Sequence, residues 1–227
     1  MLIYAKQPVN YVIKNYPNKI KTLYLAKEID KKEYSRLMKT GFEVKRIPAD
    51  AAGKMCKNAS HQGILAEVEE YNLHEYKTFL DKEFILVLSS LTDVGNIGAI
   101  IRSAYALGVD SVVACGVKKL PLEAIMRTST GALYDMPFAI EQNIHNVLND
   151  FKTSGFTSYG ADMGGNDIRD VKVKQKRVLV LGSEGEGLTN RVSSKLDEIV
   201  SIKMAHEFDS LNVSVAGAIL MDRMRYD

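Results

Sequence analysis

The feature that most constrains the fold is a series of short apolar runs in the second half of the chain. FILVLSSL at 84–91 is apolar almost throughout, and further strands are predicted at 109–116, 156–162, 177–182 and 199–204. A continuous apolar run of this length is typical of a parallel strand that is buried on both faces. Because helical segments separate the runs, the sequence predicts an α/β fold with a doubly wound parallel sheet. Such folds bind their ligands at the carboxyl ends of the strands.

The helix after the first run has the clearest periodicity. Its apolar residues recur on one stripe at Ile97, Ile100, Ile101, Ala104 and Leu107. Gly108 follows at the position where a glycine commonly ends a helix. We expect Asn96 to cap the amino end of this helix and Arg102 to lie on the side away from the stripe.

The first part of the chain is predicted to be a separate, small α/β module. Its expected elements are three strands and one helix, at 22–26, 42–47, 63–68 and 30–40. Mixed charge and weak periodicity at 71–83 indicate a linker or a short helix. We therefore divide the chain into an N-terminal domain at 1–70, a linker at 71–83 and a second domain at 84–227.

The charge is distributed unevenly between these parts. Residues 1–57 hold 13 lysines and arginines against 5 aspartates and glutamates, a net charge of +8, whereas the remainder holds 17 against 23, a net charge of −6. A basic segment beside an acidic one indicates that the first part meets a polyanion such as nucleic acid. Solvated lysines that keep a small domain soluble are the alternative interpretation.

Several classes of protein are disfavoured by what the sequence lacks. The start MLIYAKQPVN has no basic stretch followed by a long apolar one, and no run of eighteen apolar residues occurs. The two cysteines lie far apart without metal-ligand spacing, so we expect a reducing cytoplasm and no membrane association. The four histidines also lack the spacing of a metal site, and no metal is predicted.

A glycine-rich loop, GSEGEG at 182–187, follows the predicted strand at 177–182. Loops that hold phosphate usually carry a lysine, whereas this one carries Glu184 and Glu186, and its glycines do not fit GxGxxG. The loop therefore disfavours a dinucleotide-dependent oxidoreductase. It favours backbone approach by a neutral or cationic ligand, with Glu184 accepting hydrogen bonds. An exposed turn before a helix capped by Thr189 is the alternative.

A third stretch, SIKMAHEFDSLNVSVAGAILM, passes from a strand through an irregular loop into a helix that is rich in small residues. We expect Ser210 to cap this helix and Asn212 to lie in its first turn.

Together, the three stretches resemble the SpoU, or TrmH, family of RNA ribose 2′-O-methyltransferases of the knotted SPOUT class. The matching motifs are Asn96-x-Gly98-x-Ile100-x-Arg102, LGSEGEG at 181–187 and SLNVSVA at 210–216. The resemblance covers 84–227. More loosely, the first part is similar to the substrate-binding domain of the subgroup that methylates a guanosine of large-subunit (23S) ribosomal RNA, including HQGI at 61–64.

The resemblance implies S-adenosyl-L-methionine as the cofactor, held in part by backbone atoms. The residues that it assigns to cofactor binding are Leu181, Gly182, Ser183, Gly187, Ile202, Met204 and Leu211. This agrees with the charge of the glycine-rich loop, because the cofactor carries a sulfonium and no phosphate. The resemblance also implies a C-terminal trefoil knot and a homodimer formed through the second domain.

The catalytic residues that the resemblance implies are Arg102, Asn96, Glu184, Ser210 and Asn212. In the family, the counterpart of Arg102 is proposed as the general base and the others position it and the ribose. Because an arginine has a pKa above about 12, orientation of the ribose by Arg102 is the alternative role. Two residues depart from the family pattern, since Val94 and Lys203 stand where prolines are common.

The predicted function is S-adenosylmethionine-dependent 2′-O-methylation of RNA, with a guanosine of 23S ribosomal RNA as the expected target. A transfer RNA substrate is one alternative. A non-catalytic RNA-binding or ribosome-assembly factor with the same fold is another, and the complete set of five catalytic residues argues against it.

Overall fold

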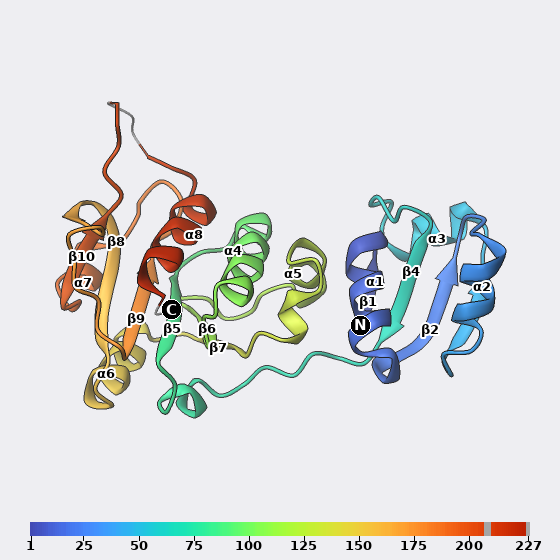
Figure 1. Cartoon of the computed structure of the whole chain (residues 1–227), viewed down its shortest axis with the longest axis horizontal. Coiled ribbons are helices and arrows are strands. Elements are labelled where there is room, and N and C mark those ends of the chain that lie inside the picture. The colour runs from blue at the N-terminus through green and yellow to red at the C-terminus, as the bar shows by residue number, and fades with distance from the viewer. Residues whose placement is uncertain (207–209, 226–227) are drawn as a thin grey trace. The chain divides into compact units, whose positions relative to one another are not determined.

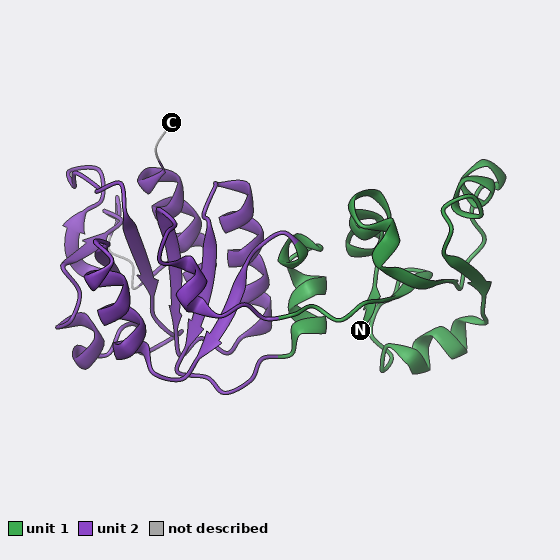
Figure 2. Ribbon diagram, turned by 90° about the horizontal axis from the view of Figure 1, so that it is seen from below, with its two compact units in different colours: residues 1–72, 121–134 green, residues 73–120, 135–227 purple. Residues whose placement is uncertain are grey.

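The computed structural model describes residues 1–206 and 210–225, which divide into two compact units. Unit 1 comprises 1–72 together with 121–134, and unit 2 comprises 73–120 and 135–227 (Figure 2). Among the described residues, no helix is both long and apolar enough to cross a membrane.

Unit 2 contains a six-stranded sheet in which every pairing is parallel. Its strands are β5 (Phe84–Ser89), β6 (Ser111–Cys115), β7 (Phe138–Glu141), β8 (Thr157–Asp167), β9 (Arg177–Leu181) and β10 (Glu198–Ser201). Their order in space is β10-β8-β9-β5-β6-β7 (Figure 1). All side chains of the two central strands, β5 and β9, are buried. The predicted α/β fold with a parallel sheet is confirmed.

Helices cover both faces of this sheet. They are α4 (Val94–Ala106), α6 (Ile144–Thr153), α7 (Asn190–Ser193) and α8 (Val213–Met224), with a short 3-10 helix, η2 (Tyr76–Phe79). One face packs against η2, α6 and α7, where Val87 and Val180 join Val147 and Phe151 in a single cluster. On the other face α8 approaches β9 closely, since a Cβ on Gly217 would lie 2.7 Å from a methyl group of Leu181.

Four of the five residues of the predicted apolar stripe are buried in α4, and the fifth, Leu107, is the partly buried C-cap of the helix; the N-cap differs from the prediction. Asp93 is the N-cap, and its Oδ1 accepts the Asn96 N–H at 2.7 Å. The prediction that Asn96 caps the helix was therefore wrong. Because Asp93 accepts a hydrogen bond from one of the N–H groups that the helix itself leaves unpaired, the helix begins just after it, and Asn96 lies in the first turn.

The start of α8 also differs from the prediction. Asn212 is the N-cap and accepts the Ser214 N–H at 2.9 Å, so the expectation that Ser210 caps the helix was wrong. Ser210 precedes the cap by two residues. The amide of Asn212 thus has one end committed to the helix, and its Nδ2 group stays free to reach other segments.

Unit 1 contains a four-stranded sheet in the order β1-β4-β2-β3. Its strands are β1 (Leu2–Tyr4), β2 (Ile20–Leu25), β3 (Glu43–Arg46) and β4 (Ile64–Val68). β4 runs antiparallel to β1 and β2, and β3 runs parallel to β2. The helical elements are α1 (Lys6–Asn15), η1 (Pro17–Lys19), α2 (Lys31–Leu37), α3 (Ala49–Met55), α5 (Leu122–Thr128) and η3 (Ala132–Tyr134).

Candidate functional site

A cavity of about 570 Å³ opens at the carboxyl ends of β9 and β10, beside the middle of β8, which lies between them in the sheet. Its walls are residues 161–163 from β8, the glycine-rich loop after β9, residues 200–202 and 204 from the end of β10 and the segment after it, and residues 210–213, 216 and 220 just before and within α8. The seven residues predicted to bind the cofactor all line it: Leu181, Gly182, Ser183, Gly187, Ile202, Met204 and Leu211. A cavity at this edge is where a parallel α/β sheet places its ligands.

The glycine-rich loop is a tight turn that closes on itself. The Ser183 N–H donates to the Gly187 carbonyl at 3.1 Å, and the Gly187 N–H returns to the Ser183 carbonyl at 3.0 Å. Gly185 and Gly187 adopt φ values of +88° and +64°, which favour glycine. A Cβ on Gly182 would collide with the backbone of Gly187 and Leu188. Three of the glycines therefore serve the shape of the loop itself.

Three of the predicted catalytic residues form one hydrogen-bonded cluster at the rim of this cavity. Asn96 from α4 donates its Nδ2 group to Glu184 Oε1 in a short hydrogen bond. Asn212 Nδ2 donates to Asn96 Oδ1 at 3.0 Å and to Glu184 Oε1 at 3.3 Å. The carboxylate of Glu184 thus accepts hydrogen bonds from two amides that belong to distant segments. This cluster, Asn96–Glu184–Asn212, ties the three sequence motifs together.

The other two predicted catalytic residues lie outside the cluster. Ser210 lines the cavity and is exposed. Arg102 is exposed on α4, and its side chain makes no hydrogen bond or ion pair with the part of the chain that the structure describes. Because it follows Asn96 by six residues, it lies about 9 Å further along the helix and about 120° around it. Arg102 therefore does not join Asn96 on one face of α4.

The cavity is acidic. Its lining contains Asp162, Glu184 and Glu186, and the described lining residues include no lysine, arginine or histidine. Such a surface attracts a cation and repels a pyrophosphate. The sequence reasoning did not include Asp162 or its neighbour Met163, which is 59% exposed at the rim. In the structure both lie inside β8, but the strand predicted at 156–162 ended at Asp162, and that end was the signal that could have identified it.

The two residues that replace the usual prolines have ordinary positions. Val94 is the first residue of α4, a position where proline is well tolerated because the N–H is not needed by the helix. Lys203 is exposed just after β10. Hydrogen bonds from Arg169 lower the pKa of Asp167 to about 2, and the positive charge of Lys203 adds to that effect. The charge of Lys203 thus acts on a carboxylate of its own unit.

Known protein families match both parts of the chain. Residues 83–222 match the SpoU rRNA methylase family, and residues 2–74 match the substrate-binding region of RNA 2′-O ribose methyltransferases. A tRNA/rRNA methyltransferase of Borreliella burgdorferi, described as uncharacterized, is 32% identical over 215 residues, which cover 88% of this chain and 94% of the relative. A putative TrmH family tRNA/rRNA methyltransferase of Staphylococcus epidermidis is 33% identical over 173 residues, 72% of this chain and 70% of the relative.

Solved structures share the fold along nearly the whole chain. The SpoU methyltransferase AviRb from Streptomyces viridochromogenes, in complex with AdoMet, superposes with a TM-score of 0.80 at 24% identity, over 99% of this chain and 88% of that one. An AdoMet-bound rRNA methyltransferase from Sinorhizobium meliloti gives a TM-score of 0.80 at 21% identity, over 99% and 86% of the two chains.

Proposed function

Because the chain belongs to the SpoU rRNA methylase family, we propose that it methylates the 2′-hydroxyl of a guanosine in 23S ribosomal RNA, with S-adenosylmethionine as the donor. The observation that carries this proposal is the Asn96–Glu184–Asn212 cluster, which joins the three family motifs at the rim of one cavity. The cluster argues against a non-catalytic RNA-binding protein, because such a protein would not need all three of these residues in one place.

The residues of the cavity fit this cofactor. Its volume of about 570 Å³ lies within the usual range for a small-molecule site. The three carboxylates of the lining favour a ligand that carries a positive charge, and the loop at 182–187 presents backbone atoms at close range. When bound, S-adenosylmethionine supplies a methyl group on a positively charged sulfur, a donor that needs no further activation. We propose that Gly182, Ile202, Met204 and Leu211 hold it through their backbone atoms.

The chain's own residues then have to align the ribose and help to remove a proton. In the cluster, Glu184 orients the two amides by accepting a hydrogen bond from each. The amides in turn fix the rim against which the ribose is placed, which is the positioning that such a displacement mainly requires. Arg102 and Ser210 are proposed to contact the ribose. Arg102 acts there either as the base or as a planar fork that orients the ribose and the adjacent phosphate.

We also propose that the protein is a homodimer and that its C-terminal segment forms the trefoil knot of the family. Support for the dimer comes from α4 and α8, which pack together within unit 2. Tyr105 on α4 and Val215 on α8 are large apolar side chains that are 45% and 47% exposed. Sedimentation equilibrium tests the dimer by measuring the mass of the particle in solution, which is 25.3 kDa for one chain. A dimer gives twice that mass, and a monomer contradicts the proposal.

The decisive test of the target is methyl transfer from labelled S-adenosylmethionine to unmodified 23S ribosomal RNA and to unmodified transfer RNA in parallel reactions. The proposal predicts label in the ribosomal RNA alone and loss of that label in an Asn96→Ala variant. Label in transfer RNA alone supports the alternative substrate. If neither RNA is labelled and calorimetric titration detects no binding of S-adenosylmethionine, the chain is a non-catalytic RNA-binding or assembly factor instead.

A further inference from the structure

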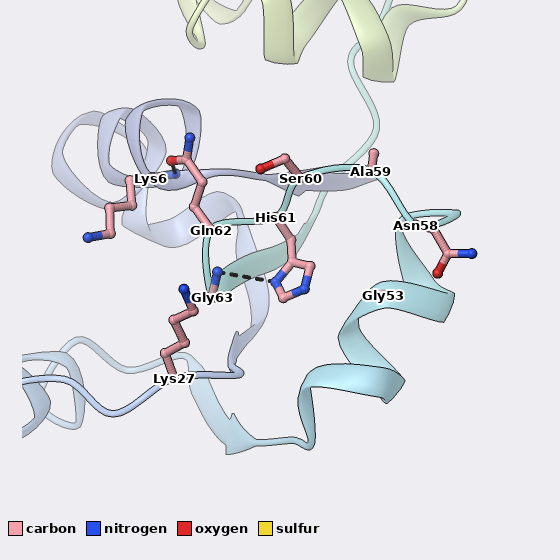
Figure 3. Close-up of a pocket in the computed structure, with 9 residues that line it drawn as sticks. All are labelled: Lys6, Lys27, Gly53, Asn58, Ala59, Ser60, His61, Gln62 and Gly63. Atoms are coloured by element: carbon pink, nitrogen blue, oxygen red, sulfur yellow. Dashed lines mark hydrogen bonds between the residues drawn. The ribbon is translucent and has the colours of Figure 1, made fainter.

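Unit 1 contains a second cavity, of about 700 Å³, that the proposed reaction does not use. It lies where the loop His61–Gln62–Gly63 meets the amino end of α1 and the segment that follows α3 (Figure 3). We call it the HQG cavity. Its volume lies within the range of small-ligand sites.

The loop holds two lysines in place around this cavity. Gln62 Oε1 accepts the backbone N–H of Lys6 at 3.0 Å, which connects the loop to the first residue of α1. Gly63 has a φ of +86°, and a Cβ at this position would lie 2.7 Å from Cγ of Lys27. The aliphatic stem of Lys27 therefore packs directly on Gly63. Any other residue at position 63 would displace that lysine.

The polar groups of the HQG cavity are suited to an anion with hydrogen-bonding edges. Its cations are Lys6 and Lys27, and the residues that the structure describes in its lining include no aspartate or glutamate. His61 Nδ1 accepts the Gly63 N–H at 3.1 Å, so the neutral ring carries its proton on Nε2 and can donate from there. The side chains of Asn58, Ser60 and Gln62 add further donors and acceptors. The acidic cavity of unit 2 has the opposite character, with carboxylates and no described cation in its lining.

The backbone around the HQG cavity is strained. Lys57, Asn58 and Gln62 have φ values of +53°, +60° and +54°, and Ala5, just before Lys6, has a φ of +79°. A positive φ is unfavourable for a residue with a side chain, and strain of this kind gathers at sites that bind or react. The strained residues at the HQG cavity are therefore consistent with a binding site.

We propose that the HQG cavity binds one nucleotide of the RNA substrate, distinct from the nucleotide that is methylated. Lys6 and Lys27 neutralise its phosphate, and His61, Asn58 and Gln62 form hydrogen bonds with its base or sugar. Sequence-specific RNA recognition usually targets unpaired nucleotides whose bases can be splayed out into such a pocket. The inference rests on the proposed function, because it takes RNA as the polyanion that meets unit 1.

The direct test follows the four histidines of the full chain by NMR, after labelling their Cε1 carbons with ¹³C. A His61→Gln variant identifies the His61 signal. The probes are the four nucleoside 5′-monophosphates, guanosine and inorganic phosphate, each added at constant pH. We expect at least one monophosphate to shift the His61 signal saturably and more strongly than guanosine or phosphate does. No shift, or an equal shift with inorganic phosphate alone, overturns the proposal.

A second test uses matched lysine variants of the full chain. The variant Lys6→Gln with Lys27→Gln removes both cations of the HQG cavity. The control, Lys14→Gln with Lys39→Gln, makes the same change in charge at two exposed lysines of unit 1 that do not line the cavity. Both variants are compared with the unaltered chain in binding and methylation of unmodified 23S ribosomal RNA.

The HQG variant should raise the KM for RNA about tenfold and leave kcat and the affinity for S-adenosylmethionine unchanged. At about 0.7 per neutralised phosphate on single-stranded RNA, the slope of log K against log salt should become shallower by about 0.7 for the one phosphate that the two lysines contact. The control should change neither quantity. Equal effects of the two variants, or no effect of the HQG variant, overturn the inference.

The two proposals fail in distinguishable ways. If the HQG variant methylates RNA as the unaltered chain does, the inference about unit 1 is wrong and the proposed function stands. If no RNA is methylated by the unaltered chain, the proposed function fails, and the histidine titration still decides whether the HQG cavity takes a nucleotide.

Discussion

Replacement of Gly182 by alanine tests whether the shape of the glycine-rich loop is needed for cofactor binding. The new Cβ would collide with backbone atoms of Gly187 and Leu188, which cannot move aside as the end of a flexible side chain can. The collision can be relieved if the loop opens. Opening breaks the two hydrogen bonds between Ser183 and Gly187.

The structure sets the size of the expected effect. Two backbone hydrogen bonds contribute about 1 kcal/mol each, so an open loop costs about 2 kcal/mol. Binding of S-adenosylmethionine requires the closed loop in our account, so the dissociation constant rises as the fraction of closed loops falls. The loop opens in about nine molecules of ten if the collision exceeds the cost of opening by about 1.4 kcal/mol, and the dissociation constant should then rise at least about tenfold. The free energy of unfolding should fall by no more than about 2 kcal/mol, because opening is local.

Calorimetric titration with S-adenosylmethionine measures the affinity, and urea unfolding measures the stability. Gly155→Ala is the matched control, since Gly155 has a φ of +85°, a Cβ added there would meet no atom within 4 Å, and the residue lines neither cavity. It should lose about 1 kcal/mol of stability through backbone strain and keep its affinity. If Gly182→Ala binds the cofactor as tightly as the unaltered chain, the loop does not form the pocket and the reasoning is refuted.

Three further changes test other parts of the account. Asn212→Ser keeps an N-cap for α8 but removes the amide that contacts Asn96 and Glu184. The free energy of unfolding, measured with urea, should therefore change by less than about 1 kcal/mol, while the rate of methyl transfer should fall. An unchanged rate contradicts a role for the cluster. Arg102→Lys removes the planar fork, and the transfer rate should fall at least about tenfold with the cofactor affinity unchanged, whereas near-normal activity in the lysine variant excludes a need for the guanidinium. Burial raises the pKa of Asp197, but hydrogen bonds from Ser158 and Lys152 outweigh it, and the net pKa is lowered. In the unfolded chain Asp197 therefore binds a proton more readily than in the folded chain. The unaltered chain should be more stable than Asp197→Asn above about pH 4, and this difference should shrink as the pH falls. Urea unfolding of both chains at about pH 6 and about pH 3 measures it. An advantage that stays constant or grows on acidification contradicts that assignment.

Five of the six strands of unit 2 were predictable, because most of their buried residues form continuous apolar runs in the sequence. The exception, β7 (Phe138–Glu141), has only four residues and was not predicted. The run at 84–91 became β5, and the run at 177–182 became β9. Unit 1 was harder to predict. β1 has only three residues and pairs with β4, more than sixty positions away, so no local pattern marks it. The helical segment at 121–134 joins unit 1 through contacts that are still more remote in sequence, such as the hydrogen bond from the Leu2 N–H to Glu123, 121 positions away.

The N-caps of α4 and α8 could not be predicted from the neighbouring sequence alone. Before α4 and before α8, several residues with short polar side chains stand within a few positions of one another, and each satisfies the chemistry of a cap. Which of them caps depends on where the helix begins, and packing decides that. The same limit applies to the site. Asn96 and Glu184 are 88 positions apart, and Asn96 and Asn212 are 116 apart, so their hydrogen bonds follow only from the fold.

The central claim is that this chain places a methyl group on a ribose oxygen, and the chemical nature of the product tests it most directly. Unmodified 23S ribosomal RNA is incubated with the chain and labelled S-adenosylmethionine, and is then hydrolysed in alkali. A 2′-O-methyl group blocks cleavage at its own linkage, so the account predicts that the label appears in an alkali-resistant dinucleotide. Label recovered in single nucleotides would place the methyl group on a base and would contradict the account.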